Sequence, residues 1–305
     1  MRLSATVRRT GLRAILPRWY QALPAWCWWL FFFVTPITWV AMASLGMKPI
    51  DPSRGAVVFD QLSLANYDAA TGNVFFAVFL ITIKTAGLGT LICFLVGFPV
   101  AYALATKVPV RWRTPLVFLL LLPYWTSFLL RTFAWRIILA PQGELSDLLR
   151  SIGLMSTPLM ILDSNTAVQL GIVYNYLPIV ILPIYVALDR IDPAFKQASM
   201  DLGAGRLGTF LQVTLPLAVP GIVGGVLLTF ILAAGDYVVP AILGGAKGLM
   251  VGNLVALQVL ASQNLPIGAA MAMVLIGLLA VVVTVVGTAA FGLRSIVRLV
   301  RGPAL

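Results

Sequence analysis

Six long apolar runs restrict how this chain can fold more than any other feature of its sequence. Each run is long enough for one α-helical crossing of a bilayer core, which needs about 20 apolar residues. The second run exceeds the length of a perpendicular crossing, so its helix should tilt or project beyond the hydrocarbon. The sequence therefore predicts an all-α, polytopic membrane protein with six transmembrane helices, at residues 26–46, 76–105, 115–139, 167–188, 217–243 and 267–293.

The composition excludes several other classes of protein. Hydrophobic residues make up 60% of the 305 residues and charged residues only 10%, which is more apolar than soluble domains are. The net charge of +11 comes from small basic clusters between the apolar runs, so nucleic acid is not an expected partner. Cys27 and Cys93 lie inside apolar runs and the sequence has no histidine, so neither a disulfide framework nor a metal site is expected. We also find no nucleophile–base pair, and we predict no catalytic residues.

The positive charges between the runs predict how the chain is oriented. If the N-terminus is cytoplasmic, the inside segments hold fourteen Lys and Arg residues and the outside segments hold five, namely Lys48, Arg54, Arg136, Arg150 and Lys247. Because Lys and Arg are enriched in cytoplasmic loops, both termini should be cytoplasmic. The basic N-terminus and first run also resemble a cleavable signal peptide. However, this run is as long as a full span and five more follow, so we expect it to remain as the first helix.

One membrane domain should account for the whole chain. Residues 1–25 are expected to form a basic cytoplasmic segment, 26–293 the transmembrane domain and 294–305 a cytoplasmic tail. The segment 47–73 contains prolines and glycines without helical periodicity, so it should be an irregular loop outside the membrane.

The most polar long stretch, KQASMDLGAGRLGTFLQVTLP, lies in the cytoplasmic loop at about 189–216 between the fourth and fifth spans. Asp192 suits a helix N-cap and Pro193 suits the first helical position, so a short helix is expected over 193–202. Gly203 would then end that helix in a left-handed conformation. Such a helix could dock into a groove on another protein, or it could simply connect two spans at the membrane surface.

This stretch resembles the EAA loop of bacterial ABC importer permeases, whose pattern is Glu-Ala-Ala, three residues, Gly, nine residues, Ile, one residue, Leu-Pro. The matching positions are Gln197, Ala198, Ser199, Gly203, Val213, Leu215 and Pro216, and Asp201 lies among them. The resemblance implies that these residues couple the permease to an ATPase. Gln197 replaces the glutamate and Ser199 an alanine, so a salt bridge made by that glutamate is not expected here.

Other segments resemble the spermidine/putrescine branch of these permeases. They are FPVAYALA, LPYWTSFLLRTFAW, YLPIVILPIYVALDRID and AAGDYVVPAILGG, and the resemblance extends over roughly 66–293. It implies a type I ABC importer permease in the bacterial cytoplasmic membrane that carries a polyamine, an opine or a related small organic solute.

The same resemblance implies several partners. They are two ATP-binding subunits, a second permease subunit that is different rather than identical, and a periplasmic solute-binding protein. The chain lacks the phosphate-binding pattern G-x-x-x-x-G-K-[ST], so ATP and Mg²⁺ should bind only to the ATPase partner and no cofactor is expected on this chain.

Three charged residues fall inside the apolar runs, and each costs about 2.5 to 3.5 kcal/mol if it faces lipid alone. They are Lys84, Arg131 and Asp236, and at about 1.5 Å per residue they could share one layer nearer the outer face. They could line a solute path. Alternatively, Asp236 could pair with Arg131 or Lys84, or the long side chains could extend to the interface.

Aromatic residues and helix breakers lie near the same positions. Pro178 and Gly235 could interrupt the fourth and fifth helices, as at the solute sites of many transporters. Aromatic rings can hold an organic amine by cation–π attraction. The predicted path residues are therefore Trp125, Tyr174, Asn175, Tyr176 and Tyr237 together with the three charged residues. Gly221 and Gly225 should instead allow close helix packing.

The alternative function is that of a self-sufficient secondary transporter or channel, which would also show six spans and buried charges. A secondary transporter has no use for a cytoplasmic docking helix, and we find no convincing inverted repeat between the two halves of the sequence. The EAA-like loop therefore favours the permease of a binding-protein-dependent importer.

Overall fold

The computed structural model describes residues 22–49, 51, 53, 55–245 and 248–300, without the side chains of 290, 291 and 293–300. Most of the predicted basic N-terminal segment, the last residues of the predicted tail, and Arg54 and Lys247 of the orientation count lie outside the described residues.

Five helical segments in this part of the chain are long and apolar enough to cross a membrane. They are Leu23–Leu45, α4 (Asn73–Thr106), α8 (Asn165–Asp189), Arg206–Ala234, and Leu265–Ala289 within α14 (Leu265–Val300). The first span consists of α1 (Leu23–Trp29), a π-helical turn and α2 (Thr35–Leu45). The fourth consists of α10 (Arg206–Thr209), a π-helical turn and α11 (Leu215–Ala234). A sixth is present if Val110–Trp125 and α6 (Phe128–Ile138) count as one span, although they are bent by 83°. The first of these two contains α5 (Val110–Leu121). The six predicted runs therefore all correspond to helices.

Short helices connect the spans. They are α3 (Ala65–Ala70), α7 (Glu144–Ser151), α9 (Pro193–Asp201), α12 (Val238–Leu243) and α13 (Val251–Ala256), which continues as a π-helical turn over Leu257–Ala261. The segment 47–73, expected to be irregular, contains α3 and one antiparallel bridge between Met47 and Val58.

The third and fifth apolar runs differ from the prediction because neither is one straight helix. A 3₁₀ turn at Leu122–Trp125 and two extended residues, Thr126 and Ser127, separate α5 from α6. The fifth run was predicted to continue to residue 243, but α11 ends at Ala234 and the chain restarts as α12. The fourth run was expected to be interrupted at Pro178, yet α8 continues through it.

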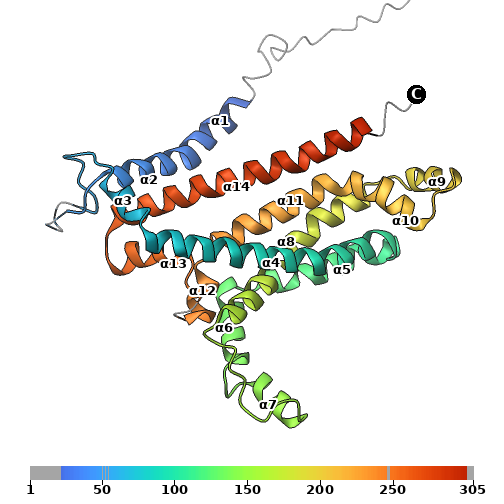
Figure 1. The fold of residues 1–305 in the computed structure, drawn as a ribbon, viewed down its shortest axis with the longest axis horizontal. Helices are drawn as coiled ribbons and strands as arrows, with labels where there is room; N and C mark the ends of the chain where they lie inside the picture. The colour runs from blue at the N-terminus through green and yellow to red at the C-terminus, as the bar shows by residue number, and fades with distance from the viewer. Residues whose placement is uncertain (1–21, 50, 52, 54, 246–247, 301–305) are drawn as a thin grey trace, which may run out of the picture.

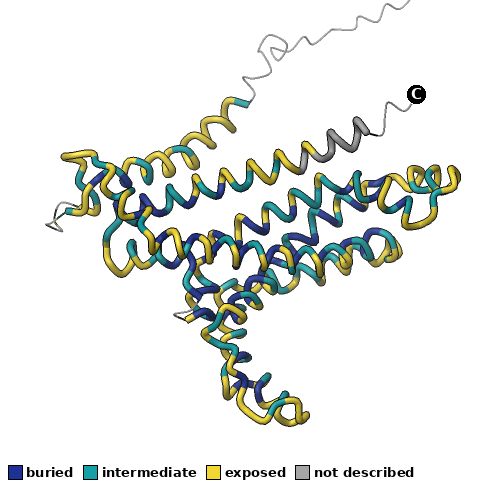
Figure 2. The backbone as a smooth tube through the Cα atoms, viewed as in Figure 1, coloured by how far each residue is buried: buried dark blue, intermediate teal, exposed yellow. Residues whose placement is uncertain are grey.

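The core lies where α4, α8 and α11 pack together (Figure 1), and buried residues concentrate along these helices (Figure 2). Glycines allow the close approach. A Cβ at Gly221 would lie 2.7 Å from the carbonyl oxygen of Pro183, and one at Gly225 would lie 3.1 Å from that of Val180. This confirms the packing role predicted for the two glycines. By contrast, α1 buries none of its residues and diverges from the bundle (Figure 1).

Candidate functional site

The predicted cytoplasmic helix is present as α9. The Asp192 carboxylate accepts a hydrogen bond from the Ala194 amide at 2.9 Å, which caps the helix start. At the other end, the Gly203 amide donates to the Met200 carbonyl at 2.9 Å and the Ala204 amide donates to the Ser199 carbonyl at 3.1 Å. Gly203 has φ +88°. These contacts form a Schellman motif, so the predicted cap, helix and left-handed glycine are all confirmed.

The surface of α9 and the following turn is open and partly apolar. No residue of α9 is buried, and Leu202 is 89% exposed. Gln197, Ala198 and Asp201 are exposed, whereas Ser199 is half-buried and its hydroxyl lies 3.2 Å from that of Thr209.

The chain then enters α11 through the half-buried Leu215 and Pro216, while the Phe210 ring packs against Tyr102 of α4 at 5.5 Å. Helix α9 thus projects from one end of the bundle (Figure 1), and the contact between Phe210 and Tyr102 anchors its loop to α4.

Asp236 lies at the break between α11 and α12 and is 7% exposed. One carboxylate oxygen accepts hydrogen bonds from the amides of Val238 at 2.8 Å and Val239 at 3.2 Å, and the other accepts one from the Tyr176 hydroxyl at 3.0 Å. The carboxylate therefore takes two backbone amides that would otherwise bond to carbonyls of a continuing α11. This explains why the helix of the fifth run breaks here. Within the described residues, Asp236 forms no ion pair with Arg131 or Lys84.

Arg131 of α6 packs against an aromatic ring and forms no ion pair with Asp236 within the described residues. Its guanidinium carbon lies 4.6 Å from the centre of the Tyr124 ring, and the Tyr124 hydroxyl donates to the Asn175 carbonyl. The Nε and Nη1 atoms of Arg131 are buried and have no hydrogen-bond partner among the described residues. The same is true of Oδ1 of Asn175. Cation–π attraction to the Tyr124 ring therefore helps to stabilise this charge, whose Nε and Nη1 lack partners.

Lys84 is exposed on α4. The carbonyl of its neighbour Thr85 accepts a hydrogen bond from Gln169 at 2.9 Å. Gln169 precedes Tyr176 by seven residues on α8, which at about 1.5 Å per residue is about 10 Å along the helix. Asp236 and Arg131 both reach the same turn of α8, Asp236 through Tyr176 and Arg131 through Tyr124 and Asn175. The common layer of all three charges stays a prediction.

The predicted path residues divide by accessibility. Trp125 is 79% exposed, Tyr237 49% and Tyr174 39%, so these three rings lie on the surface of the chain. Asn175 and Tyr176 are buried at 1% and 8% exposure, so in this conformation they do not. Sequence reasoning had no means of separating the two groups, because accessibility depends on which helices pack together.

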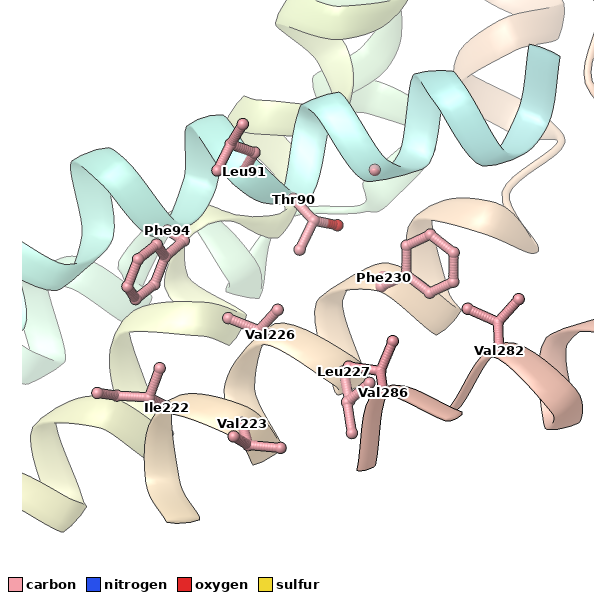
Figure 3. A pocket seen from close by; sticks show the side chains of 11 residues that line it. Thr90, Leu91, Phe94, Ile222, Val223, Val226, Leu227, Phe230, Val282 and Val286 are labelled. Atoms are coloured by element: carbon pink, nitrogen blue, oxygen red, sulfur yellow. The ribbon is translucent and has the colours of Figure 1, made fainter. Parts of the chain in front are cut away.

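Several surface grooves lie along the described part of the chain, and two of them involve the helices discussed above. Tyr237 lines one of about 380 Å³, together with residues of α12 and α13. Asn253 lines the same groove and its side-chain amide donates to the Tyr237 carbonyl at 2.8 Å, a contact that the sequence analysis missed. A second groove, of about 400 Å³, lies between α4, α11 and α14 (Figure 3). Thr90 is its only polar side chain, so it offers nothing that would recognise a charged solute.

The sequence from 21 to 295 matches the family described as "Binding-protein-dependent transport system inner membrane component". The chain belongs to this family. It is therefore a multi-pass inner membrane protein, a permease component of an importer and not its ATP-hydrolysing enzyme.

Curated relatives agree with this assignment. The permease is 36% identical over 242 residues to the spermidine/putrescine transport system permease protein PotB of Escherichia coli (strain K12), covering 79% of this chain and 86% of the relative. It is 35% identical to the PotB protein of Haemophilus influenzae, covering 84% and 88% of the two chains. It is also 33% identical to the inner membrane ABC transporter permease protein YdcU of Escherichia coli (strain K12), covering 80% and 84%.

Solved structures share the fold. A chain of a bacterial ABC transporter that imports the acidic polysaccharide alginate superposes with a TM-score of 0.71 at 16% identity, covering 90% of this permease and 94% of that chain. The all-α permease fold predicted from the sequence is thereby confirmed.

Proposed function

We propose that this permease forms part of the translocation path for a polyamine or a related organic cation in an ATP-driven importer. The names of the PotB relatives, which cover most of both chains, support this substrate class. In this proposal the chain binds no cofactor, and ATP and Mg²⁺ bind to the ATPase partner. Both termini lie in the cytoplasm, as the distribution of Lys and Arg favours.

The docking element in this proposal is α9. Its exposed surface, its fixed start at Asp192 and its fixed end at Gly203 are the observations that carry the assignment. A short helix held at both ends can transmit movement, because a force on it reaches α11 through Leu215 and Pro216 instead of being absorbed by a loose loop. Gln197 and Asp201 lie four residues apart on α9, and both are exposed to a partner.

The expected partners are two ATP-binding subunits, a second permease of different sequence and a periplasmic solute-binding protein. A structural relative was solved as an alginate transporter in complex with a periplasmic protein carrying an alginate pentasaccharide, at a TM-score of 0.66 and 16% identity. That complex supports a periplasmic partner for this fold. The solute would meet Trp125, Tyr174 and Tyr237 along the path, because these rings remain accessible on the permease.

The test is reconstitution of the permease with its ATPase, second permease and binding protein in proteoliposomes. Uptake of labelled spermidine should require both ATP on the ATPase side and the binding protein on the opposite side. A variant ATPase that binds but does not hydrolyse ATP is the matched control and should abolish uptake. Uptake by this chain alone, driven by an ion gradient without ATP, would instead identify a secondary transporter.

A further inference from the structure

Three hydrogen-bond donors of this chain surround the Asp236 carboxylate. Both carboxylate oxygens already accept hydrogen bonds, two from the amides of Val238 and Val239 and one from the hydroxyl of Tyr176. The side chain is also almost fully buried. A solute cation would therefore have to compete with donors of the chain for a carboxylate that is already buried.

Tyr237, the next residue, is held from the other side. Its carbonyl accepts a hydrogen bond from Asn253 of α13, and the Asn253 side-chain oxygen accepts one from the Met250 amide at 3.2 Å. Gly252 lies so close that a Cβ there would be 3.0 Å from the Tyr237 Cβ and 3.2 Å from the Asp236 carbonyl oxygen. Residues of α8, α12 and α13 thus fix the backbone of Tyr237, while its ring remains half exposed and lines the groove of about 380 Å³.

We infer that Tyr237 is a solute-contacting residue and that Asp236, with Tyr176, is the positioning group that holds it in place. This inference rests on the proposed function and changes the role expected of Asp236. The carboxylate acts by accepting hydrogen bonds at the break between α11 and α12, and its negative charge is not what the solute recognises. The Tyr237 ring then offers its face to an ammonium group.

Substitutions at Asp236 separate the two roles. Asn has the same size, and its oxygen can cap the Val238 and Val239 amides while its amide donates to the Tyr176 oxygen. Ala can do neither. Loss of a helix cap shifts a local equilibrium by about 2- to 30-fold, so D236A should reduce spermidine-stimulated ATPase activity by a factor in that range. D236N should restore most of the activity that D236A loses.

Substitutions at Tyr237 test the contact itself. Y237F keeps the aromatic face and should retain stimulation, whereas Y237A should reduce it about tenfold, as expected when a cation–π contact is lost. Thermal stability of the complex should be unchanged in both variants, because the ring is half exposed. That readout separates a solute contact from a structural residue.

The measurement is solute-stimulated ATPase activity of the full reconstituted complex, at saturating spermidine-loaded binding protein, alongside complex yield. Stimulation of the wild-type complex establishes the proposed function independently of the variants. If D236N assembles but is inactive, its charge is required and the positioning role is refuted, whatever D236A does. Full activity of D236A, or equal activity of Y237A and Y237F, would also overturn the inference.

Discussion

Substitution of Gly203 by Val gives the most direct test of α9 as a coupling element. Gly203 ends α9 with φ +88°, a conformation that β-branched residues adopt poorly. No atom lies within 4 Å of the position that a Cβ would occupy, so a larger side chain meets no steric obstacle there. The perturbation therefore acts on the backbone alone.

The expected magnitude follows from the conformation. A non-glycine residue in the left-handed region costs roughly 1 to 2 kcal/mol, and 1.4 kcal/mol is a factor of ten in an equilibrium constant. In G203V, the equilibrium constant between the Schellman ending and a frayed helix end should therefore fall by a factor of about 5 to 30. Because α9 buries no residue, no packing contact offsets this strain.

Gly205 provides the matched control. It also has open space around it, but its φ is −66° and its ψ is 171°, a conformation that Val adopts readily. G203V should uncouple ATP hydrolysis from spermidine uptake while the permease still inserts and assembles, whereas G205V should transport normally. Assembly is measured as complex yield, and coupling as uptake per ATP hydrolysed in proteoliposomes.

Two results would refute the reasoning. Normal coupling in G203V would mean that the helix ending does not matter. Equal failure of G203V and G205V would mean that any side chain in this loop blocks docking, so that sterics and not backbone conformation decide the outcome.

Three further predictions test packing, buried charge and orientation. R131M should leave the thermal stability of the complex unchanged or raised, because each buried donor without a partner costs about 1 to 3 kcal/mol; a marked loss would reveal an acceptor supplied by another subunit. G221A should destabilise the complex by about 1 to 3 kcal/mol in thermal unfolding because its Cβ would press on Ala187 and the Pro183 carbonyl. G224A, in open space, should not, and equal effects would contradict the packing argument. In a cysteine-free background, an impermeant thiol reagent added outside should label a cysteine at Met160, which is 82% exposed, but not one at Leu202; the reverse pattern would invert the orientation.

Sequence reasoning succeeded where local chemistry decides the structure. Asp192, Pro193 and Gly203 each satisfy a rule that involves only a few neighbouring residues, and all three have their predicted roles at the ends of α9. A long apolar run likewise predicts a helix that is covered by lipid or protein, whatever its neighbours in the fold are. The six helical regions could therefore be located from the sequence.

It failed where distant segments meet. The π-helical continuation of α13 and the 83° bend before α6 lie within apolar sequence, and hydropathy alone treats such stretches as uniform. Lys84 was grouped with Arg131 and Asp236 because all three are charged and nearer one face. The hydrogen bond between Gln169 and the neighbour of Lys84, Thr85, could not be predicted from the sequence, because it joins α4 to α8.

The charged residues in the spans show why charge alone is a weak guide to a solute path. A charge inside a membrane protein must be paired, hydrogen-bonded or stacked, and each of these arrangements leaves less of the charged group available to a solute. Asp236 gives both oxygens to its own chain, and Arg131 covers the ring of Tyr124. The neutral rings of Trp125 and Tyr237 require no such compensation, so they can remain exposed at little cost. Accessible aromatic residues held in place by buried polar ones are therefore the stronger candidates for contact with an organic cation.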